Sequence, residues 1–336
     1  MDTSSPNFLI IKPSSLGDIV HGLLVAQMIK IGRPLAHIDW VCRDIFAPLV
    51  ARCPVVDNIL LFERHRGLRG FLGLIRKLRQ RQYTHVLDLQ GLARSALIAR
   101  SARAGKIIGR SDAREGAKYA YHRRAPLPPQ GRGAHAVAIL AEFLPLLGLP
   151  RDVIPRLSFR APGCLDESPL KNGAAMLPSP QDEHQATCSK QRAKRSILLF
   201  PESSRPEKNW PGYELLTNLL LKTIPEVCVV WAGARTMPSP SVPSEACFVN
   251  RSGQTSLAEL PDLLSQARLV VGNDSGPLHL AAAMGIPTLA LFGPTSPARY
   301  RPYPGDDLTN RVLRAPQDDM RLLEPDAALE SIRDML

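Results

Sequence analysis

The chain has 336 residues, of which 44% are hydrophobic and 22% are charged, and its formal net charge is +11. This length suffices for two globular domains, and no apolar run approaches the roughly 18 residues of a membrane-spanning helix. We expect no secretory signal, because no basic stretch precedes the first apolar run. The six scattered cysteines contain no C-x-x-C pair, which argues against a zinc site or a disulfide scaffold and favours a cytoplasmic location.

The positive charge is concentrated in one part of the chain. Residues 64–132 contain 17 Lys or Arg and only 3 Asp or Glu. Such an excess attracts nucleic acid, an anionic membrane or a phosphorylated glycolipid, and it is also found on solvated surfaces without a ligand. Because the chain has no nucleic-acid-binding motif and few interleaved aromatic residues, we expect no nucleic-acid partner.

The N-terminal half alternates short apolar runs with helical patterns, which predicts an α/β domain. Strands are expected at 8–12, 36–42, 58–62, 85–89 and 107–109, and helices from about 18, at 45–51, at 68–80, from about 90–95 and at 135–147. The helix at 68–80 is basic and amphipathic, a pattern that is also found in membrane-surface helices. We favour a crossover helix with a basic outer face.

Asp18 is placed where the first strand ends and the first helix begins. Ligands of open α/β sheets bind at this edge, and the helix dipole is expected to lower the pKa of a carboxyl group there. An ionised carboxylate at this point can accept a proton from a hydroxyl group. The alternative is an ordinary acidic residue in the first turn of a helix.

A segment without apolar periodicity separates the two halves. Residues 162–194 are rich in Pro, Ser, Gln and Lys, and we expect a flexible linker or insertion at 161–195 whose role cannot be read. It divides an N-terminal domain, 1–160, from a C-terminal domain, 196–336. In the second domain, strands are expected at 196–201, 227–231, 247–249, 269–271 and 287–292, and helices at 213–222, 257–265, 277–284 and 325–336. For the last helix, packing back onto the N-terminal domain is left open.

The turn at 272–276 has the features of an anion-binding site. Asp274 or Ser275 can cap the following helix, Pro277 suits its first position, and Gly276 allows a ligand to approach the backbone. His279 lies in the first turn of that helix. An ordinary capped helix in an α/β sheet explains these residues equally well.

Several stretches resemble one known family. D-S-G-P-L-H-L-A-A-A-x-G-x-P followed by L-F-G-P-T-S-P is similar to the diphosphate-binding signature of glycosyltransferase family 9, the heptosyltransferases of lipopolysaccharide core assembly. K-P-S-S-L-G-D-I-V-H resembles the N-terminal signature of that family. D-x-Q-G-L-x-x-S and S-D-A-R-E-G-A-K-Y-A-Y resemble its acceptor-side loops, and S-R-x-x-K-x-W-P resembles the segment that holds the donor phosphate. The resemblance implies a GT-B fold, with two Rossmann-like domains facing a central cleft.

The resemblance also implies an inverting transfer of heptose from ADP-heptose to a lipopolysaccharide core acceptor, with Asp18 as general base and without a metal or another cofactor. The implied donor-binding residues are Ser204, Arg205, Lys208, Asp274, Ser275, Gly276, Pro277 and His279. The implied acceptor-binding residues are Ser14, Ser15, His21, Gln90, Arg94 and Arg114. The acceptor would be an anionic glycolipid, and peripheral contact with the cytoplasmic face of the inner membrane is left open.

One loop departs from the family pattern. Several heptosyltransferases carry an acidic residue after the strand at 227–231 that binds the donor ribose, whereas this chain has Ala234 and Arg235. Two alternatives therefore stay open: a GT-B glycosyltransferase that uses a different nucleotide sugar, and a nucleotide-binding relative without catalytic activity.

Overall fold

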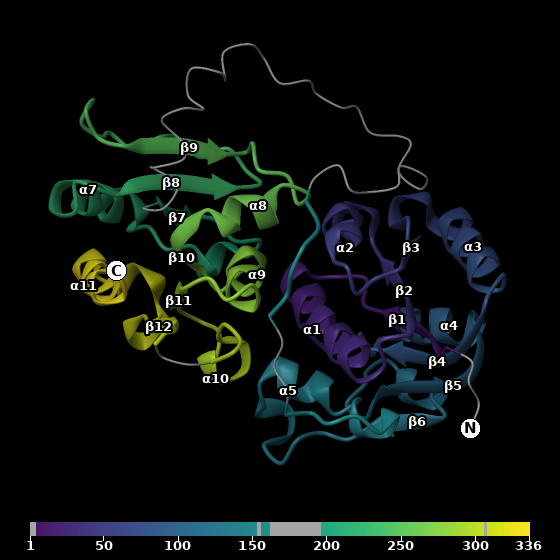
Figure 1. Ribbon diagram of the computed structural model, residues 1–336. Coiled ribbons are helices and arrows are strands. Elements are labelled where there is room, and N and C mark those ends of the chain that lie inside the picture. The colour runs from purple at the N-terminus through teal and green to yellow at the C-terminus, as the bar shows by residue number, and fades with distance from the viewer. Residues whose placement is uncertain (1–4, 153–155, 162–195, 306–307) are drawn as a thin grey trace, which may run out of the picture. The chain divides into compact units, whose positions relative to one another are not determined.

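Two six-stranded sheets, each in its own unit, form the framework of the protein (Figure 1). The computed structural model describes residues 5–152, 156–161, 196–305 and 308–336. One unit comprises Met1–Phe159 with Ala298–Arg301, and the other comprises Arg160–Pro297 with Pro302–Leu336. The division after Phe159 lies next to the predicted boundary at residue 160. Apart from Ala161, the predicted linker at 161–195 lies outside the described residues.

The sheet of the first unit has the strand order β3-β2-β1-β4-β5-β6, and every pair of neighbouring strands is parallel. The order reverses between β1 and β4, which is where ligands bind in open α/β sheets. The strands are β1 (Asn7–Ile11), β2 (His37–Cys42), β3 (Asn58–Leu61), β4 (Gln82–Asp88), β5 (Arg103–Arg110) and β6 (Arg123–Ala125). The α-helices are α1 (Leu16–Gly32), α2 (Ala47–Arg52), α3 (Gly67–Leu78), α4 (Ala93–Ser101) and α5 (Ala136–Ala141).

Helices cover both faces of this sheet. The apolar sides of α3 and α4 share one core cluster with β1, β4 and β5. On the other face, α1 approaches so closely that a Cβ on Gly22 would lie 2.9 Å from the ring of Trp40 in β2. The prediction that residues 68–80 form a crossover helix is correct: α3 buries Gly70, Leu74 and Leu78, partly buries Phe71 and Ile75, and exposes its basic residues to solvent.

The second unit repeats the same topology, with the order β12-β11-β10-β7-β8-β9. Its strands are β7 (Ser196–Phe200), β8 (Cys228–Gly233), β9 (Phe248–Ser252), β10 (Ala267–Asn273), β11 (Thr288–Phe292) and β12 (Asn310–Arg314). The α-helices that follow residue 196 are α7 (Tyr213–Thr223), α8 (Leu260–Ser265), α9 (Gly276–Ala283), α10 (Pro297–Tyr300) and α11 (Pro325–Met335). The order reverses between β7 and β10, so the loops after these two strands form the expected ligand edge.

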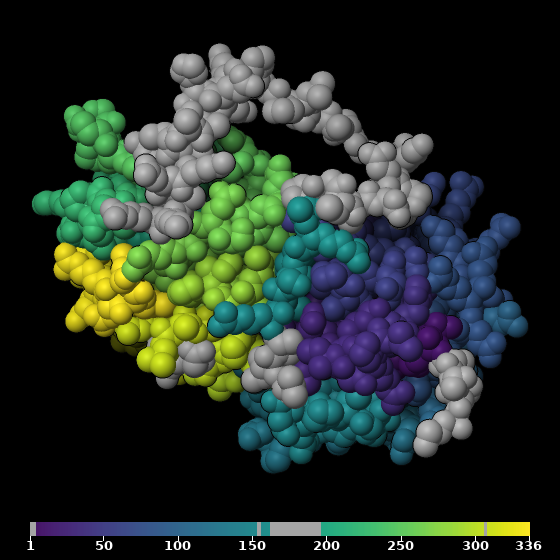
Figure 2. Space-filling view, in the orientation of Figure 1, coloured from purple at the N-terminus to yellow at the C-terminus, as the bar shows by residue number. Residues whose placement is uncertain are grey.

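The last helix packs within the second unit. Leu329 and Ile332 of α11 share a core cluster with Leu216 and Leu220 of α7 and with the central strands, and Figure 1 shows these two helices side by side. The described contacts of α11 in this cluster therefore belong to the C-terminal domain. Figure 2 shows, in purple, residues from the start of the chain on the surface of the first unit and, in yellow, residues near its end on the surface of the second.

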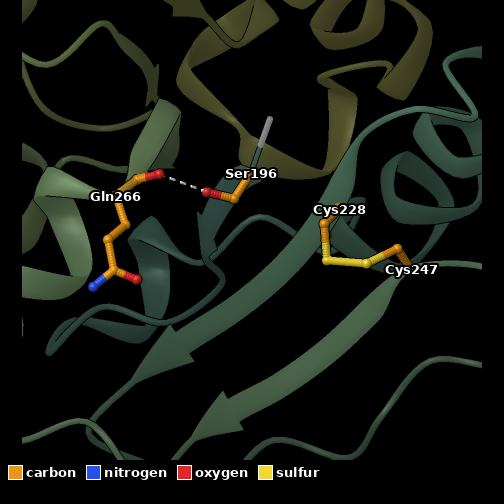
Figure 3. Close-up of a disulfide and its surroundings, with 4 residues drawn as sticks. All are labelled: Ser196, Cys228, Cys247 and Gln266. Carbon is orange, nitrogen blue, oxygen red and sulfur yellow. Dashed lines mark hydrogen bonds between the residues drawn. A yellow bond between two sulfur atoms is a disulfide. The ribbon is translucent and has the colours of Figure 1, made fainter. Parts of the chain in front are cut away.

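The structure contains a disulfide that the sequence did not predict, although no disulfide scaffold was expected. Cys228 at the start of β8 is bonded to Cys247, which immediately precedes β9 (Figure 3). The register pairs Val229 with Phe248, so the residues before them are also neighbours. A separation of 19 residues gives no sequence signal for such a pair. Cys42 and Cys53 are both buried.

Most predicted elements occur within a few residues of their expected positions. The exceptions are the short edge strands β6 and β12 and the helix α10, which were not predicted. The expected helix at 135–147 is shorter: α5 ends at Ala141, and a separate 3-10 turn forms at Pro145–Leu147. Pro145 explains the break, because it has no N–H to continue the helical hydrogen bonds.

Candidate functional site

Asp18 lies at the ligand edge of the first unit, three residues into α1. Ser15 is the N-cap residue of this helix. Its backbone amide and its hydroxyl both donate to Oδ2 of Asp18, at 3.1 and 2.9 Å. The other oxygen, Oδ1, lies 3.2 Å from Nζ of Lys12, which is almost fully buried at the end of β1, whereas the Asp18 side chain keeps 45% of its surface exposed. The carboxylate is therefore fixed on one side and open on the other.

The surroundings of Asp18 keep it ionised. Partial burial raises its pKa, but the charge of Lys12 and the two hydrogen bonds from Ser15 together lower the pKa well below the ordinary value. The sequence led us to expect this direction from the helix dipole alone. The structure adds Lys12, which the motif contained but to which we gave no role.

A second buried carboxylate organises the neighbouring loops. Asp88, the last residue of β4, accepts hydrogen bonds from the backbone amides of Gln90 and Gly91 and from the hydroxyls of Ser95 and Tyr121. These bonds hold the turn between β4 and α4. Asp88 begins the D-x-Q-G-L-x-x-S motif, but the sequence assigned it no function. The only hint in the sequence was a charged residue at the end of an apolar strand.

Three of the predicted acceptor-binding residues, Gln90, Arg94 and Arg114, follow the neighbouring strands β4 and β5. The backbone amide of Arg114 donates to the carbonyl of Gly91, which joins the loop after β5 to the turn that carries Gln90. Arg94 follows that turn and extends from α4 over the ring of Phe62, with its guanidinium carbon 5.9 Å from the ring centre. The side chains of Arg94 and Arg114 are exposed.

The other three predicted acceptor-binding residues lie on or before α1. The Ser15 hydroxyl is already used by Asp18, so its first role is to hold that carboxylate. His21 is only 4% exposed, and its ring packs edge-on against His135, 5.9 Å between centres. Such burial does not favour direct contact with an acceptor, so the acceptor-binding role of His21 stays a prediction. Ser14 is partly exposed in the loop before the helix.

In the second unit, a lysine and a carboxylate pair at the ligand edge. Lys208, in the loop after β7, places Nζ 2.6 Å from Oδ2 of Asp274, which follows β10. The Asp274 side chain is 6% exposed and the Lys208 side chain 14% exposed. The loops after the two central strands therefore meet, as the sheet order requires.

Asp274 binds two further side chains. Oδ1 lies 3.1 Å from Nε2 of His279, and Oδ2 accepts a hydrogen bond of 2.9 Å from the hydroxyl of Thr295. Burial raises the pKa of Asp274, but hydrogen bonding to His279 and Lys208 and their positive charges lower it to about 2. Thr295 was not predicted as a site residue, although it lies in the L-F-G-P-T-S-P part of the signature.

The N-terminus of α9 differs in one detail from the prediction. Ser275 is its N-cap residue, but neither its side chain nor that of Asp274 makes the expected cap hydrogen bond. Among the described residues, the buried Ser275 hydroxyl has no hydrogen-bond partner. Gly276 and Pro277 begin the helix. A helix start without a side-chain cap leaves backbone N–H groups for an anion.

The remaining predicted donor-binding residues are exposed. Ser204 lies in the loop after β7, and the neighbouring Arg205 donates to Glu207 through Nε at 2.7 Å. Such exposed ion pairs are weak, so the guanidinium is available to a stronger anion. Across the described ranges, no group of three or more His, Cys, Asp or Glu side chains is arranged to hold a metal ion. The expectation of a metal-free reaction stays a prediction.

A family model for glycosyltransferase family 9 (heptosyltransferase) matches residues 71–322, which is well over half of the chain. The chain belongs to glycosyltransferase family 9. It is therefore a glycosyltransferase. A lipooligosaccharide heptosyltransferase 2 from Haemophilus influenzae is 30% identical over 321 residues, covering 90% of this chain and 87% of the relative. A lipopolysaccharide heptosyltransferase 1 from Escherichia coli is 25% identical and covers 96% of this chain and 98% of the relative.

Solved structures of the family share the fold. The E. coli heptosyltransferase WaaC with ADP matches with a TM-score of 0.75 at 22% identity, covering 98% of this chain and all of that one. The E. coli ADP-heptose lps heptosyltransferase II matches with a TM-score of 0.68 at 20% identity, covering 98% of both chains. The predicted fold class, a GT-B protein with two Rossmann-like domains, is confirmed.

Proposed function

We propose that this member of family 9 transfers heptose from ADP-heptose to an anionic lipopolysaccharide core acceptor, with inversion at the anomeric carbon and without a metal ion. The curated relatives are named as heptosyltransferases of lipopolysaccharide or lipooligosaccharide, and structures of WaaC contain ADP or an ADP-2-deoxy-2-fluoro heptose. The observation that carries the proposal is the pair of lysine-held carboxylates, Asp18 with Lys12 and Asp274 with Lys208, at the ligand edges of the two sheets.

The second unit binds the donor in this proposal. The diphosphate rests on the N–H groups at the start of α9 and beside Lys208, with Arg205 as a further cation. As the bond between the anomeric carbon and the diphosphate oxygen breaks, negative charge develops on the leaving group. A helix N-terminus and a lysine that are already oriented stabilise this charge without reorganisation. Because these groups supply the positive charge, the proposal needs no metal.

The first unit binds the acceptor and supplies the base. The acceptor hydroxyl oxygen attacks the anomeric carbon from the side opposite the diphosphate, so one displacement inverts the configuration. The hydroxyl becomes acidic only as the new C–O bond forms, and its proton then passes to Asp18. Asp18 is ionised before every turnover and can accept this proton, because the attacked hydroxyl becomes strongly acidic once the new C–O bond forms. Gln90, Arg94 and Arg114 are proposed to hold the acidic acceptor.

The proposal includes a location at the cytoplasmic face of the inner membrane. No helix in the described ranges has the length and apolar character that crossing a bilayer requires. Helix α3 instead offers a surface for peripheral contact, which we call the α3 face: Leu68 and Leu72 are 72% and 55% exposed, four residues apart on one side, next to Arg69 and Arg76. Exposed leucines among arginines suit an anionic lipid surface.

Thermal-shift measurements with different nucleotide sugars test the donor. We expect stabilisation by ADP-sugars, and transfer to a core acceptor that persists when EDTA is present. Stabilisation by UDP-sugars alone would instead favour the alternative of a different nucleotide donor. Loss of transfer in EDTA that is restored by a divalent cation would contradict the metal-free mechanism.

A further inference from the structure

The loop after β8 has no acidic side chain of its own, yet a carboxylate reaches it from another strand. Glu202 follows β7, and its Oε1 accepts hydrogen bonds from the backbone amides of Ala234 and Arg235, at 2.7 and 2.8 Å. The side chain is only 14% exposed. Gly233 makes room for it: its φ is +153°, and a Cβ there would lie 3.0 Å from Oε1.

The second oxygen of Glu202 is unsatisfied. Oε2 is buried and has no hydrogen-bond partner among the residues that the structure describes. Its nearest cation is Nε of Arg235 at 3.7 Å, beyond hydrogen-bond distance, and the Arg235 side chain is 68% exposed. A buried carboxylate oxygen without a hydrogen bond is costly, and natural proteins rarely leave one without a reason. If Glu202 served only to hold the loop, Oε1 alone would suffice.

The position of Glu202 suits one part of a nucleotide donor. It lies on the same loop as Lys208, and β7 is the strand between β10, which carries Asp274, and β8. Neighbouring strands are about 4.8 Å apart. A diphosphate held by Lys208 and the start of α9 therefore places the adjoining sugar of the nucleoside toward β8. Carboxylates at this edge of Rossmann-like sheets bind ribose hydroxyls.

We propose that Glu202 binds the ribose hydroxyls of the nucleotide donor through Oε2, in place of an acidic residue after β8. The inference rests on the proposed function, because it requires a nucleoside diphosphate on the second unit. It assigns selectivity for a ribonucleotide to a residue in the loop after β7. The ribose O–H groups donate to Oε2, while Oε1 continues to hold the backbone of the β8 loop.

Calorimetric titration with ADP, 2′-deoxy-ADP and 3′-deoxy-ADP tests this role in the wild-type chain and in Glu202→Gln. The glutamine keeps a carbonyl oxygen for the two backbone amides but presents an NH₂ group, which cannot accept a hydrogen bond. We expect the wild type to bind at least one deoxy analogue about tenfold or more weakly than ADP, as for a lost hydrogen bond to a charged group. In Glu202→Gln, binding of ADP should weaken to a similar extent, and the preference for ADP over the deoxy analogues should disappear.

The control is Glu226→Gln, which makes the same change of charge at an exposed site just before β8, at the opposite end of that strand. It should bind ADP as the wild type does and keep the preference for ribose. If Glu202→Gln binds ADP normally and still discriminates against the analogues, the inference is wrong while the proposed donor stands. If the wild type binds no adenine nucleotide at all, the proposed donor fails and the inference fails with it.

Discussion

In each unit, an aspartate is held by a poorly exposed lysine at the ligand edge of the sheet. Lys12 pairs with Asp18 in the first unit, and Lys208 pairs with Asp274 in the second. The two pairs serve different purposes in our account. Asp18 is half exposed and available to a substrate, whereas Asp274 is buried and fixes the side chains of Lys208 and His279 for the donor. We therefore propose that Asp274 positions the groups that contact the donor, whereas its own contact with the donor, which the resemblance implied, stays a prediction.

Protonation of Asp274 lowers the stability of the folded protein. Its pKa is lowered from 3.8 to about 2 in the folded protein. A carboxyl group whose pKa is lower in the folded state contributes stability above its unfolded pKa. That contribution is therefore complete above about pH 4 and is lost as the pH falls from there toward about 2.

Replacing Lys12 by methionine should move the acid limb of the pH–rate profile. Burial raises the pKa of Asp18, and Lys12 normally counteracts this effect. In Lys12→Met only the other partners, such as Ser15, remain to counteract it, so the pKa of Asp18 rises. We expect the rate of Lys12→Met to fall at a higher pH than that of the wild type as the pH is lowered. Steady-state kcat measured across the acid range checks this expectation.

The matched control is Lys30→Met, which removes another Lys–Asp pair in the same unit, with Asp57 at 2.8 Å. Its acid limb should coincide with that of the wild type. An unchanged limb in Lys12→Met, with Asp18 still required for transfer, would show that Lys12 does not set the ionisation of the base.

At the scale of elements, the turn between β4 and α4 depends on Asp88. Four donors converge on this buried carboxylate, two from the backbone and two from hydroxyl groups. Asp88→Ala should lower the free energy of unfolding by about 2–4 kcal/mol, because it leaves buried donors without a partner. Asp88→Asn should cost much less, because its amide keeps an oxygen for the backbone and the hydroxyls of Ser95 and Tyr121 can turn to accept from its NH₂. Urea unfolding of both variants measures the difference, and equal losses would contradict this role.

The sequence predicts elements well where periodicity is strong, and it predicts side-chain partners poorly. The apolar runs predicted β1, β7 and β11 to within one residue at each end, and β10 and α3 were predicted to within two. The edge strands β6 and β12 are short and partly polar, so no apolar run marks them.

The site follows the same rule. Asp18, Lys208 and Asp274 were found through motifs, and their loops were placed at the correct sheet edges. The contacts of Glu202 with the loop after β8 and of Thr295 with Asp274 were not predicted, because only the folded sheet brings these loops together. The burial of His21 likewise depends on the packing of α1 against α5, which the sequence did not show.

For the whole molecule, the uneven charge suggests where the chain meets its surroundings. The excess of basic residues at 64–132 includes the α3 face, where Leu68 and Leu72 are exposed. We expect binding to vesicles that contain anionic phospholipid, weakening as salt is raised, because the attraction between exposed charges is screened. Leu68→Ser with Leu72→Ser should reduce this binding.

Co-sedimentation with anionic and with neutral vesicles is the measurement, and Leu215→Ser is the control, since this leucine is 53% exposed on α7 of the other unit. The control should bind like the wild type. Equal binding by the double variant and the wild type would remove the α3 face from the proposed membrane contact.

The central claim is that Asp18 accepts the proton of the acceptor hydroxyl, and the direct test is the rate of heptose transfer by Asp18→Asn, measured together with its affinity for ADP. The asparagine keeps the shape of the side chain and an oxygen for Ser15 but cannot take up the proton. Our account predicts that kcat falls by about 10²–10⁴-fold, as for loss of a general base, while ADP affinity and the activity of the exposed control Asp152→Asn are unchanged. Transfer by Asp18→Asn at the wild-type rate would contradict the account.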